Sequence, residues 1–425
     1  PDRKGTILSA GELAGLALPA TCEVVIPPAV CHGVGADGLA MILHSGIRQE
    51  QGTVLITDYG TNAEMALCYE GRIINASAAA GPALEGQHIS CGMLASPGTV
   101  TDVQPRSRSR YRTTVLEKGM LPVQGPQVDL ERPSSPDETG VTLRGITGAG
   151  VVAVLSEAME ANFVRLPQIV TPDGCLHLGR NIHLDESDLQ AAGKAIGAIR
   201  AGHATLCHEA GIGYGEVQTI YMAGATGTYV DPVKAQRLGL LPSRVNSVIQ
   251  VGNTSLKMAR ALVADMGRLS EMQEMARRMR RDHCMLASSE IFKKIYLLEL
   301  AYWTEGMPME NYRSLLVRYG LKDFPTRVAT PPRVRRATRR DLGELGRLGL
   351  RVIENISQAV CRPIAGCTAC QACIDACPQS ALVLENQKDP PAIQLDPSRC
   401  AGVSCKRCEQ ACPEKVMIMV DFFLD

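Results

Sequence analysis

The sequence predicts an α/β body with a separate small domain at its carboxyl end, and three observations predict this organisation. Strand-like and helix-like runs alternate across residues 217–256, the pattern of α/β folds. Glycine-rich turns follow several strand-like runs, at the position where such sheets bind ligands. Nine of the sixteen cysteines lie between Cys361 and Cys412. We therefore expect a ligand-binding α/β body followed by a cysteine-rich domain.

The two cysteine runs near the carboxyl end have the spacing of cubane iron–sulfur ligands. The first run reads C-x2-C-x2-C-x3-C-P, and the second has two extra residues after its first cysteine. Three thiolates of one run bind three irons of a cube, and the fourth ligand comes from the other run. One 4Fe-4S cluster is therefore assigned to Cys367, Cys370, Cys373 and Cys412. The other is assigned to Cys400, Cys405, Cys408 and Cys377.

Two other interpretations of these cysteines fit the pattern less well. Disulfides require an oxidising compartment, and two matched runs of four are not what random pairing gives. Zinc knuckles use C-x2-C pairs without a third step and a terminal Cys-Pro. Cys361 lies before the first run, and we interpret it as a spare thiol.

Length and composition limit the class of protein. The 425 residues have room for two or three domains, and the formal net charge is zero. Neutral charge and only 4% aromatic residues give no case for a nucleic-acid partner. There is no uncharged apolar run long enough to cross a membrane and no signal peptide, so we expect a cytoplasmic protein without a membrane partner. The chain opens with Pro1, which suggests a fragment or a processed form.

The strand-like run Val54–Asp58 enters a turn that suits a nucleotide phosphate. Gly60, Thr61 and Asn62 follow Asp58, and two further strand-like runs complete a β-meander up to Asn75. Backbone N–H groups of such a turn form an anion nest, and a carboxylate can hold Mg²⁺ through water. The alternative is an ordinary hairpin with an asparagine in its turn.

The stretch from Ala76 to Gly150 contains weaker signals. Small residues dominate residues 76–101 and allow close backbone approach. Glu85 among them is interpreted as a solvated loop carboxylate, and the alternative is that it helps to position a metal or water. Residues 105–140 are expected to form an exposed hairpin or loop insertion, with four alternating arginines on a solvated face. The glycine-rich turn at residues 145–150 precedes an apolar helix, a weak phosphate signal.

Further along, helices and strands alternate clearly. A long helix is predicted from Asp185 to Gly211, and a strand ending near Met222 enters the glycine turn at residues 223–228. Another strand–helix pair follows at residues 247–256, and residues 268–320 are predicted to be helical. A basic, proline-containing linker and one more helix fill residues 325–360.

Four segments together carry a resemblance to a known family. They are 58–64 (DYGTNAE), 145–150 (GITGAG), 222–232 (MAGATGTYVDP) and 251–256 (VGNTSL). In this order they resemble the ATP-dependent reductive activators of corrinoid proteins. The chain is most similar to the iron–sulfur activases of methylamine methyltransferase corrinoid proteins from methanogens, which end in a two-cluster ferredoxin domain.

The resemblance implies a fold and a nucleotide site. The body would be a ribonuclease-H-like two-lobe ATPase of the sugar kinase, heat-shock chaperone and actin superfamily, over residues 1–324. The bacterial-type ferredoxin domain would be α+β and cover residues 361–425. Asp58 would be catalytic, and the nucleotide would be bound by Gly60, Thr61, Asn62, Gly148, Gly150, Gly224 and Gly227. Family members carry another such phosphate hairpin near the amino terminus; nothing in residues 1–53 matches it, so it is expected upstream of Pro1.

The resemblance also implies an activity. The chain would use ATP with Mg²⁺ and two 4Fe-4S clusters to reduce Co(II) of a corrinoid protein to Co(I). The corrinoid protein and an external low-potential electron donor would be its partners. Two alternatives are an ATP-driven electron-transfer activator of another metalloenzyme and a ferredoxin-type module with a non-catalytic nucleotide fold.

Overall fold

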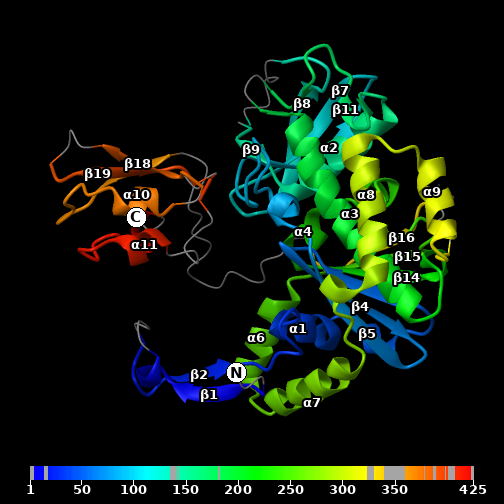
Figure 1. The fold of residues 1–425 in the computed structure, drawn as a ribbon, viewed down its shortest axis with the longest axis horizontal. Coiled ribbons are helices and arrows are strands. Elements are labelled where there is room, and N and C mark those ends of the chain that lie inside the picture. Colours follow the sequence, from blue (N-terminus) through cyan, green and yellow to red (C-terminus); the bar gives the residue numbers. More distant parts are fainter. Residues whose placement is uncertain are drawn as a thin grey trace.

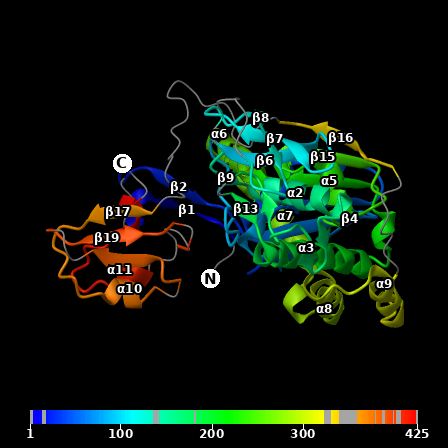
Figure 2. The same ribbon diagram turned by 90° about the horizontal axis from the view of Figure 1, so that it is seen from above.

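The computed structural model describes most of the chain. The described residues are 4–13, 18–134, 141, 143–179, 182–322, 330–338, 359–377, 379–385, 389–397, 399–400 and 407–422. They form an α/β body (Figures 1 and 2) and a small cysteine-rich domain. In this part of the chain no helix is long and apolar enough to span a bilayer.

A six-stranded sheet in the order β16-β15-β14-β3-β4-β5 is the centre of the body. Its strands are β3 (Val54–Asp58), β4 (Asn62–Tyr69), β5 (Arg72–Ala79), β14 (Thr219–Ala223), β15 (Ser247–Gly252) and β16 (Arg333–Arg336). The first three pair antiparallel, whereas β14, β15 and β16 run parallel to β3. A three-stranded meander extended by parallel strands is the arrangement expected of a ribonuclease-H-like lobe, and the predicted meander is confirmed.

Both faces of the inner strands of this sheet are buried, because successive residues of β3, β14 and β15 are buried rather than every second one. Along β3, Val54 and Ile56 pack into one hydrophobic core, and Leu55 packs into another. The first core is closed by α1 (Ala36–His44), α6 (Thr254–Ala264) and α7 (Arg268–Arg281), and the second by α3 (Glu186–Glu209). Figure 1 shows α1, α6 and α7 on one side of the sheet and α3 and α8 on the other.

A second, four-stranded sheet in the order β8-β7-β6-β9 packs on α2 (Gly148–Glu160). Its strands are β6 (Thr99–Pro105), β7 (Arg110–Leu116), β8 (Pro122–Asp129) and β9 (Gly145–Ile146). Of the expected exposed hairpin or loop insertion at residues 105–140, the described part is a hairpin, β7 with β8, but it is not wholly exposed, since Tyr111, Thr113 and Val115 are buried on one face. Arg106, Arg108 and Arg110 are exposed, as predicted, whereas Arg112 is half-buried.

The remaining helices of the body pack around α3. α8 (Glu290–Glu305) lies along α3, and α9 (Met309–Arg318) packs on α8 (Figure 2). Short helices α4 (Gly224–Tyr229) and α5 (Pro232–Arg237) follow β14. Small hairpins complete the body: β1 (Thr6–Ser9) with β2 (Glu23–Ile26), β10 (Val164–Arg165) with β11 (Gln168–Ile169), and β12 (Leu176–His177) with β13 (His183–Leu184).

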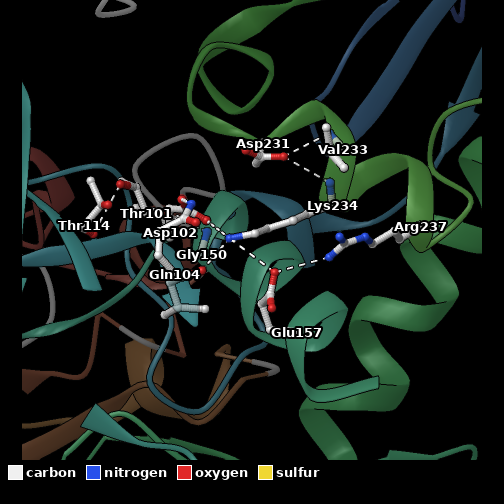
Figure 3. A network of polar contacts seen from close by, with 12 residues as sticks. Thr101, Asp102, Gln104, Thr114, Gly150, Glu157, Asp231, Val233, Lys234 and Arg237 are labelled. Atoms are coloured by element: carbon white, nitrogen blue, oxygen red, sulfur yellow. Dashed lines mark hydrogen bonds and ion pairs between the residues drawn. The ribbon is translucent and has the colours of Figure 1, made fainter. Parts of the chain in front are cut away.

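A buried ion network fixes α5 against α2 and β6 (Figure 3). Lys234 lies 2.5 Å from Asp102 Oδ1 and 3.7 Å from Glu157 Oε1, and it also donates to the Val103 carbonyl. Glu157 Oε1 forms a second ion pair with Nη1 of Arg237, at 3.4 Å. A buried ammonium is tolerated only when it is paired in this way. The network therefore holds the β14–α4–α5 segment against the helix that begins at Gly148.

The expected linker at residues 325–360 is partly a strand of the body. Arg333–Arg336 forms β16, which pairs in parallel with β15 from Ser247↔Arg333 to Gln250↔Arg336. All four residues are exposed, so neither burial nor alternation marked them as a strand. The helix predicted over residues 342–360 lies almost wholly outside the described residues.

The cysteine-rich domain has its own three-stranded antiparallel sheet in the order β17-β19-β18. Its elements are β17 (Val360–Pro363), β18 (Leu382–Glu385), β19 (Ala392–Leu395), α10 (Ala372–Asp375) and α11 (Arg407–Ala411). Ile364, Leu382, Leu395 and Phe422 belong to its separate core.

Candidate functional site: a nucleotide-type cleft and a cysteine pocket

A cleft of about 550 Å³ opens where β3 and β14 end at the same edge of the central sheet. This is the position at which ligands bind in α/β sheets, and the volume is typical of a small-molecule site. The cleft is lined by residues from seven segments of the chain. They include Asp37, Asp58, Gly60, Thr61, Asn62, Glu64, Glu85, Met93, Thr147, Gly148, Gly224, Thr226, Asn253 and Ser255.

Two hydrogen bonds to Glu85, which the sequence did not indicate, fix the turn between β3 and β4. Thr61 donates its backbone N–H to Glu85 Oε1 at 2.8 Å and its hydroxyl to Oε2 at 2.7 Å. Glu85 ends the 3₁₀ turn Pro82–Glu85 and is half-buried. The interpretation of Glu85 as a solvated loop carboxylate is therefore wrong, because the carboxylate orients the exposed Thr61 in the cleft.

Gly224 lies directly beside Asp58 and cannot be replaced without strain. Its φ is +79°, a conformation that favours glycine, and a Cβ there would lie 2.1 Å from Asp58 Oδ1. The neighbouring strand residues Ala223 and Asp58 are paired across β14 and β3. The ends of the two strands therefore bring the predicted phosphate turn and the predicted glycine loop together.

The other predicted glycines divide into two groups. Gly148 begins α2 and lines the cleft, and a Cβ on it would lie 1.8 Å from the Leu84 carbonyl oxygen. Gly150 and Gly227 are absent from the described lining of the cleft; Cβ atoms there would meet the Val100 carbonyl at 2.4 Å and Met222 at 3.1 Å. These two glycines therefore allow close packing behind the cleft wall.

Four carboxylates converge on one wall of the cleft. Burial raises the pKa of Asp58 to about 6, with further contributions from Asp37 and Glu85. Burial and the charge of Asp37 raise the pKa of Glu64 to about 8. Carboxylates gathered in a cleft favour a bound cation when they are anionic. Among the described residues, no three of these side chains are placed as ready metal ligands.

Asp37, Glu64, Asn253 and Ser255 were not predicted as site residues. The sequence predicts Asn253 or Thr254 only as the cap of the next helix; in the structure Asn253 is the cap, and its side chain accepts from Leu256 N–H at 2.8 Å. Asp37 follows the glycine-rich turn at residues 33–35, a local signal that could have indicated a ligand loop. Glu64 lies in an apolar strand, where a buried acid is itself a functional signal.

In the small domain, four of the predicted ligands line one pocket. They are Cys367, Cys370, Cys373 and Cys412, three from the first run and one from the second. Ala369, at φ +55°, donates its backbone N–H to Cys367 Sγ at 3.4 Å. Burial raises the pKa of the Cys373 thiol, and the three neighbouring sulfurs raise it further. Four cysteine sulfurs in one pocket are the donor set of a 4Fe-4S cluster, whose binding would deprotonate them, so the residues present fit such a cluster.

The second predicted set is described only in part. Cys408 is buried in the core of this domain, and Cys377 and Cys400 pack against that core. Ala381 donates its N–H to Cys377 Sγ at 3.4 Å. Cys405 lies outside the described residues. Cys361 lies on β17, where its thiol contacts Glu385 Oε2 at 3.5 Å.

The fold and the two sites define a class of protein: an ASKHA domain, the fold of actin, sugar kinases and heat-shock chaperones, joined to a 4Fe-4S dicluster domain. Residues 52–313 match the family described as the C-terminal domain of RACo, the ASKHA domain. Residues 366–416 match the 4Fe-4S dicluster domain. The fold class expected from the sequence is confirmed by these matches.

The relatives identify the family more narrowly. The [Co(II) methylated amine-specific corrinoid protein] reductase of Methanosarcina barkeri is 41% identical over 403 residues, which are 95% of this chain and 74% of that protein. The corrinoid activation enzyme RamQ of Eubacterium limosum is 30% identical over 247 residues, covering 52% of this chain and 37% of that protein. A solved reductive activator for a corrinoid, iron–sulfur protein superposes with a TM-score of 0.56 at 25% identity, covering 69% of this chain and 46% of its own. The chain belongs to the family of corrinoid protein reductive activators.

Proposed function

We propose that this chain activates a corrinoid protein of a methylamine methyltransferase system in methanogenesis by ATP-dependent, one-electron reduction of Co(II) to Co(I). One observation carries the proposal: a phosphate-type cleft and a four-cysteine pocket occur in a single chain. This combination suits a protein that couples nucleotide chemistry to electron transfer. The name of the Methanosarcina relative, aligned along 95% of this chain, supports the direction of that electron transfer.

The small domain would hold two 4Fe-4S clusters. Cys367, Cys370, Cys373 and Cys412 would ligate the first, and Cys400, Cys405, Cys408 and Cys377 the second. When bound, such clusters supply single electrons at low potential. The N–H groups of Ala369 and Ala381, each 3.4 Å from a cysteine sulfur, would stabilise the thiolate form of these ligands. An external low-potential donor would refill the clusters.

The cleft would hold the phosphates of ATP. Gly60, Thr61 and Asn62 would line the phosphates, with the backbone N–H groups of Gly60 and Asn62 facing them and Glu85 holding the turn through the N–H of Thr61. Asp58 would hold Mg²⁺ through water, which also relieves the repulsion among the carboxylates of the cleft. Gly224, in the loop proposed for the adenosine side of the nucleotide, would leave room for the Asp58 carboxylate, because a Cβ there would lie 2.1 Å from Asp58 Oδ1.

ATP is needed because the electron transfer is uphill for a cluster whose potential lies above that of the cobalt centre. Each 59 mV of shortfall costs about tenfold in the equilibrium of a one-electron transfer. ATP can compensate only if it binds or reacts differently in two conformational states of the protein. We infer that closure of the cleft around ATP provides these states and changes how the corrinoid protein is held.

The proposal is tested by following Co(I) absorbance after anaerobic mixing of the reduced protein with a Co(II) corrinoid protein. Co(I) should form with ATP and Mg²⁺, and omitting ATP should leave the cobalt as Co(II). Asp58→Asn should remove the ATP response, whereas Cys370→Ala should remove the electron supply. Equal Co(I) yields with and without ATP would refute the coupling and favour a simple electron-transfer module.

A further inference from the structure

A cysteine, a histidine and an asparagine form a hydrogen-bonded chain outside the residues that line the cleft. Cys31 lies in the loop that leads into α1, and its thiol is only partly buried. Its Sγ lies 3.2 Å from Nε2 of His283, a residue 252 positions later in the chain. His283 follows α7 and is also partly buried. Neither side chain has a part in the proposed nucleotide or cluster chemistry.

The third member fixes which imidazole nitrogen carries the proton. Asn75, fully buried on β5, donates its side-chain Nδ2 to the Met279 carbonyl at 2.6 Å. Its Oδ1 therefore faces His283 Nδ1, at 3.0 Å, and can only accept. In the neutral ring the proton must lie on Nδ1, so Nε2 presents a lone pair to the Cys31 thiol. A thiol, a base and a group that orients the base are the components of an activated nucleophile.

The backbone on both sides holds this geometry. Asn75 N–H donates to the Asp282 carbonyl at 3.1 Å, and Cys284 N–H donates to the Asn75 carbonyl at 2.8 Å, so His283 is clamped to the edge of β5. The loop of Cys31 is closed by the hydrogen bond from Val30 N–H to Val34 O at 3.0 Å. Arg280 Nε from α7 donates to Val30 O at 2.9 Å. The same helix end therefore positions both the thiol loop and the histidine.

Within the part of the body that the structure describes, no histidine is hydrogen-bonded to another thiol. Burial raises the pKa of Cys68 and of Cys284 to about 11, and that of Cys91 to about 12. Cys22 is partly buried like Cys31, but its thiol contacts only the Glu23 carbonyl, at 3.8 Å. Cys31 is partly buried like Cys22, and it is distinguished from these other thiols by the oriented imidazole beside it.

We propose that Cys31 is a reactive thiol that takes up soft electrophiles, low-molecular-weight disulfides in particular. His283 Nε2 accepts the thiol proton as the sulfur attacks one sulfur of the disulfide. The new bond joins Cys31 Sγ to that sulfur, the original S–S bond breaks, and the leaving thiolate takes the proton from His283. A mixed disulfide and one free thiol are formed, and no other oxidant is consumed.

The experiment uses the full chain with its clusters bound, under anaerobic conditions near neutral pH. A short pulse of iodoacetamide, or of oxidised glutathione, is quenched, and peptide mass spectrometry gives the modified fraction of each cysteine. Cys31 should react about tenfold faster than Cys22 with both reagents. In His283→Gln the rate at Cys31 should fall to that of Cys22, and the rate at Cys22 should not change.

His208→Gln is the matched control, since His208 is an exposed histidine at the end of α3, and the rate at Cys31 should be unaffected. Fluorescence of Trp303, the single tryptophan, verifies that each variant is folded. Equal rates at Cys31 and Cys22 in the wild-type protein would overturn the proposal, whether or not the variants fold. An unchanged rate at Cys31 in folded His283→Gln would overturn the role of the imidazole.

Discussion

Glu85 binds Thr61 through both of its carboxylate oxygens, at 2.8 Å to the backbone nitrogen and 2.7 Å to the hydroxyl. The two residues are 24 positions apart, and they join the 3₁₀ turn after β5 to the turn between β3 and β4. Because the Thr61 N–H and hydroxyl are both donated to Glu85, the contact fixes the conformation of the turn between β3 and β4. A turn with this support is preorganised before a ligand enters the cleft.

Glu85→Ala should therefore slow ATP-dependent Co(I) formation by about tenfold, because roughly 1.4 kcal/mol of positioning is lost with the two hydrogen bonds. Glu85→Gln retains the size and one acceptor, so it should recover most of the rate. Initial rates at saturating ATP measure the effect. Gln87→Ala, an exposed residue of the same segment, should match the wild type. If Glu85→Gln is as slow as Glu85→Ala, the charge of Glu85 matters and its positioning role is refuted.

Gly224→Ala should abolish ATP binding. The new Cβ would lie 2.1 Å from Asp58 Oδ1, so the carboxylate must move, in addition to the strain of φ +79°. Gly71→Ala is a matched control, because Gly71 has φ +76° and nothing within 4 Å of its Cβ position. Gly71→Ala should lower the free energy of unfolding by about 1–2 kcal/mol through backbone strain alone, and it should leave ATP affinity unchanged. Isothermal titration and urea unfolding separate the two effects; equal losses of affinity would contradict a specific role for the Gly224–Asp58 contact.

Local signals in the sequence predict structure that depends on neighbouring residues. They predict the β3–β4–β5 meander, which the structure confirms. They also predict Asp185 or Ser187 as the cap of α3 and Asn253 or Thr254 as the cap of α6, and the structure has Asp185 and Asn253 there. Local signals do not indicate a contact between distant segments, such as that of Glu85 with Thr61. The exposed strand β16 carries no apolar alternation, so only its pairing with β15 identifies it.

The same limit applies to the candidate site. Asp58, Thr61 and Gly224 were predicted because they belong to compact motifs. Asp37 and Glu64 reach the cleft from a helix start and a strand interior, and nothing local shows that they converge. The approach of Cys31 to His283 across 252 positions is likewise a property of the tertiary fold alone.

Removing either partner of the buried Arg200–Glu299 ion pair should lower the stability of the protein, but by different amounts. Two hydrogen bonds of 2.6 Å and 2.5 Å join the side chains inside the α3–α8 interface, and Tyr312 also donates to Glu299. Glu299→Leu leaves a buried guanidinium that cannot lose its proton, whereas the carboxylate left by Arg200→Met can be protonated. We expect Glu299→Leu to cost about 3–5 kcal/mol and Arg200→Met to cost less.

The double variant Arg200→Met/Glu299→Leu should recover most of this loss, because the interface then contains no unpaired charge. Urea unfolding followed by Trp303 fluorescence measures all three variants, since Trp303 is buried on α8 itself. Additive losses in the double variant would show that the two side chains act independently.

The buried His203 should make the protein less stable in acid. It is fully buried between Thr57, 2.7 Å from its Nε2, and Tyr214, and burial lowers its pKa to about 3. The unfolded chain binds this proton below about pH 6.5 while the native state does not, so stability falls as the pH drops from 6.5 towards 3. The loss between pH 7 and pH 5 should be about 2 kcal/mol.

His203→Gln should be less dependent on pH by that amount, as measured by urea midpoints from Trp303 fluorescence. His208→Gln, at an exposed position, should retain the full dependence of the wild type. Parallel pH curves for the wild type and His203→Gln would show that another group titrates.

Replacing Cys370 should lower the iron content of the protein, whereas replacing Cys361 should not. Cys370 lines the four-cysteine pocket, whereas Cys361 lies on β17 beside Glu385. A chain with two 4Fe-4S clusters binds about eight iron atoms. Cys370→Ala removes one of four ligands and should lower the count towards about four, with loss of half the visible absorbance. Cys361→Ala should retain the full count, since that thiol is not needed as a ligand.

Loss of iron in Cys361→Ala, or full retention in Cys370→Ala, would require a different ligand set. Sulfide counts on the same samples distinguish a lost cluster from one with a missing iron.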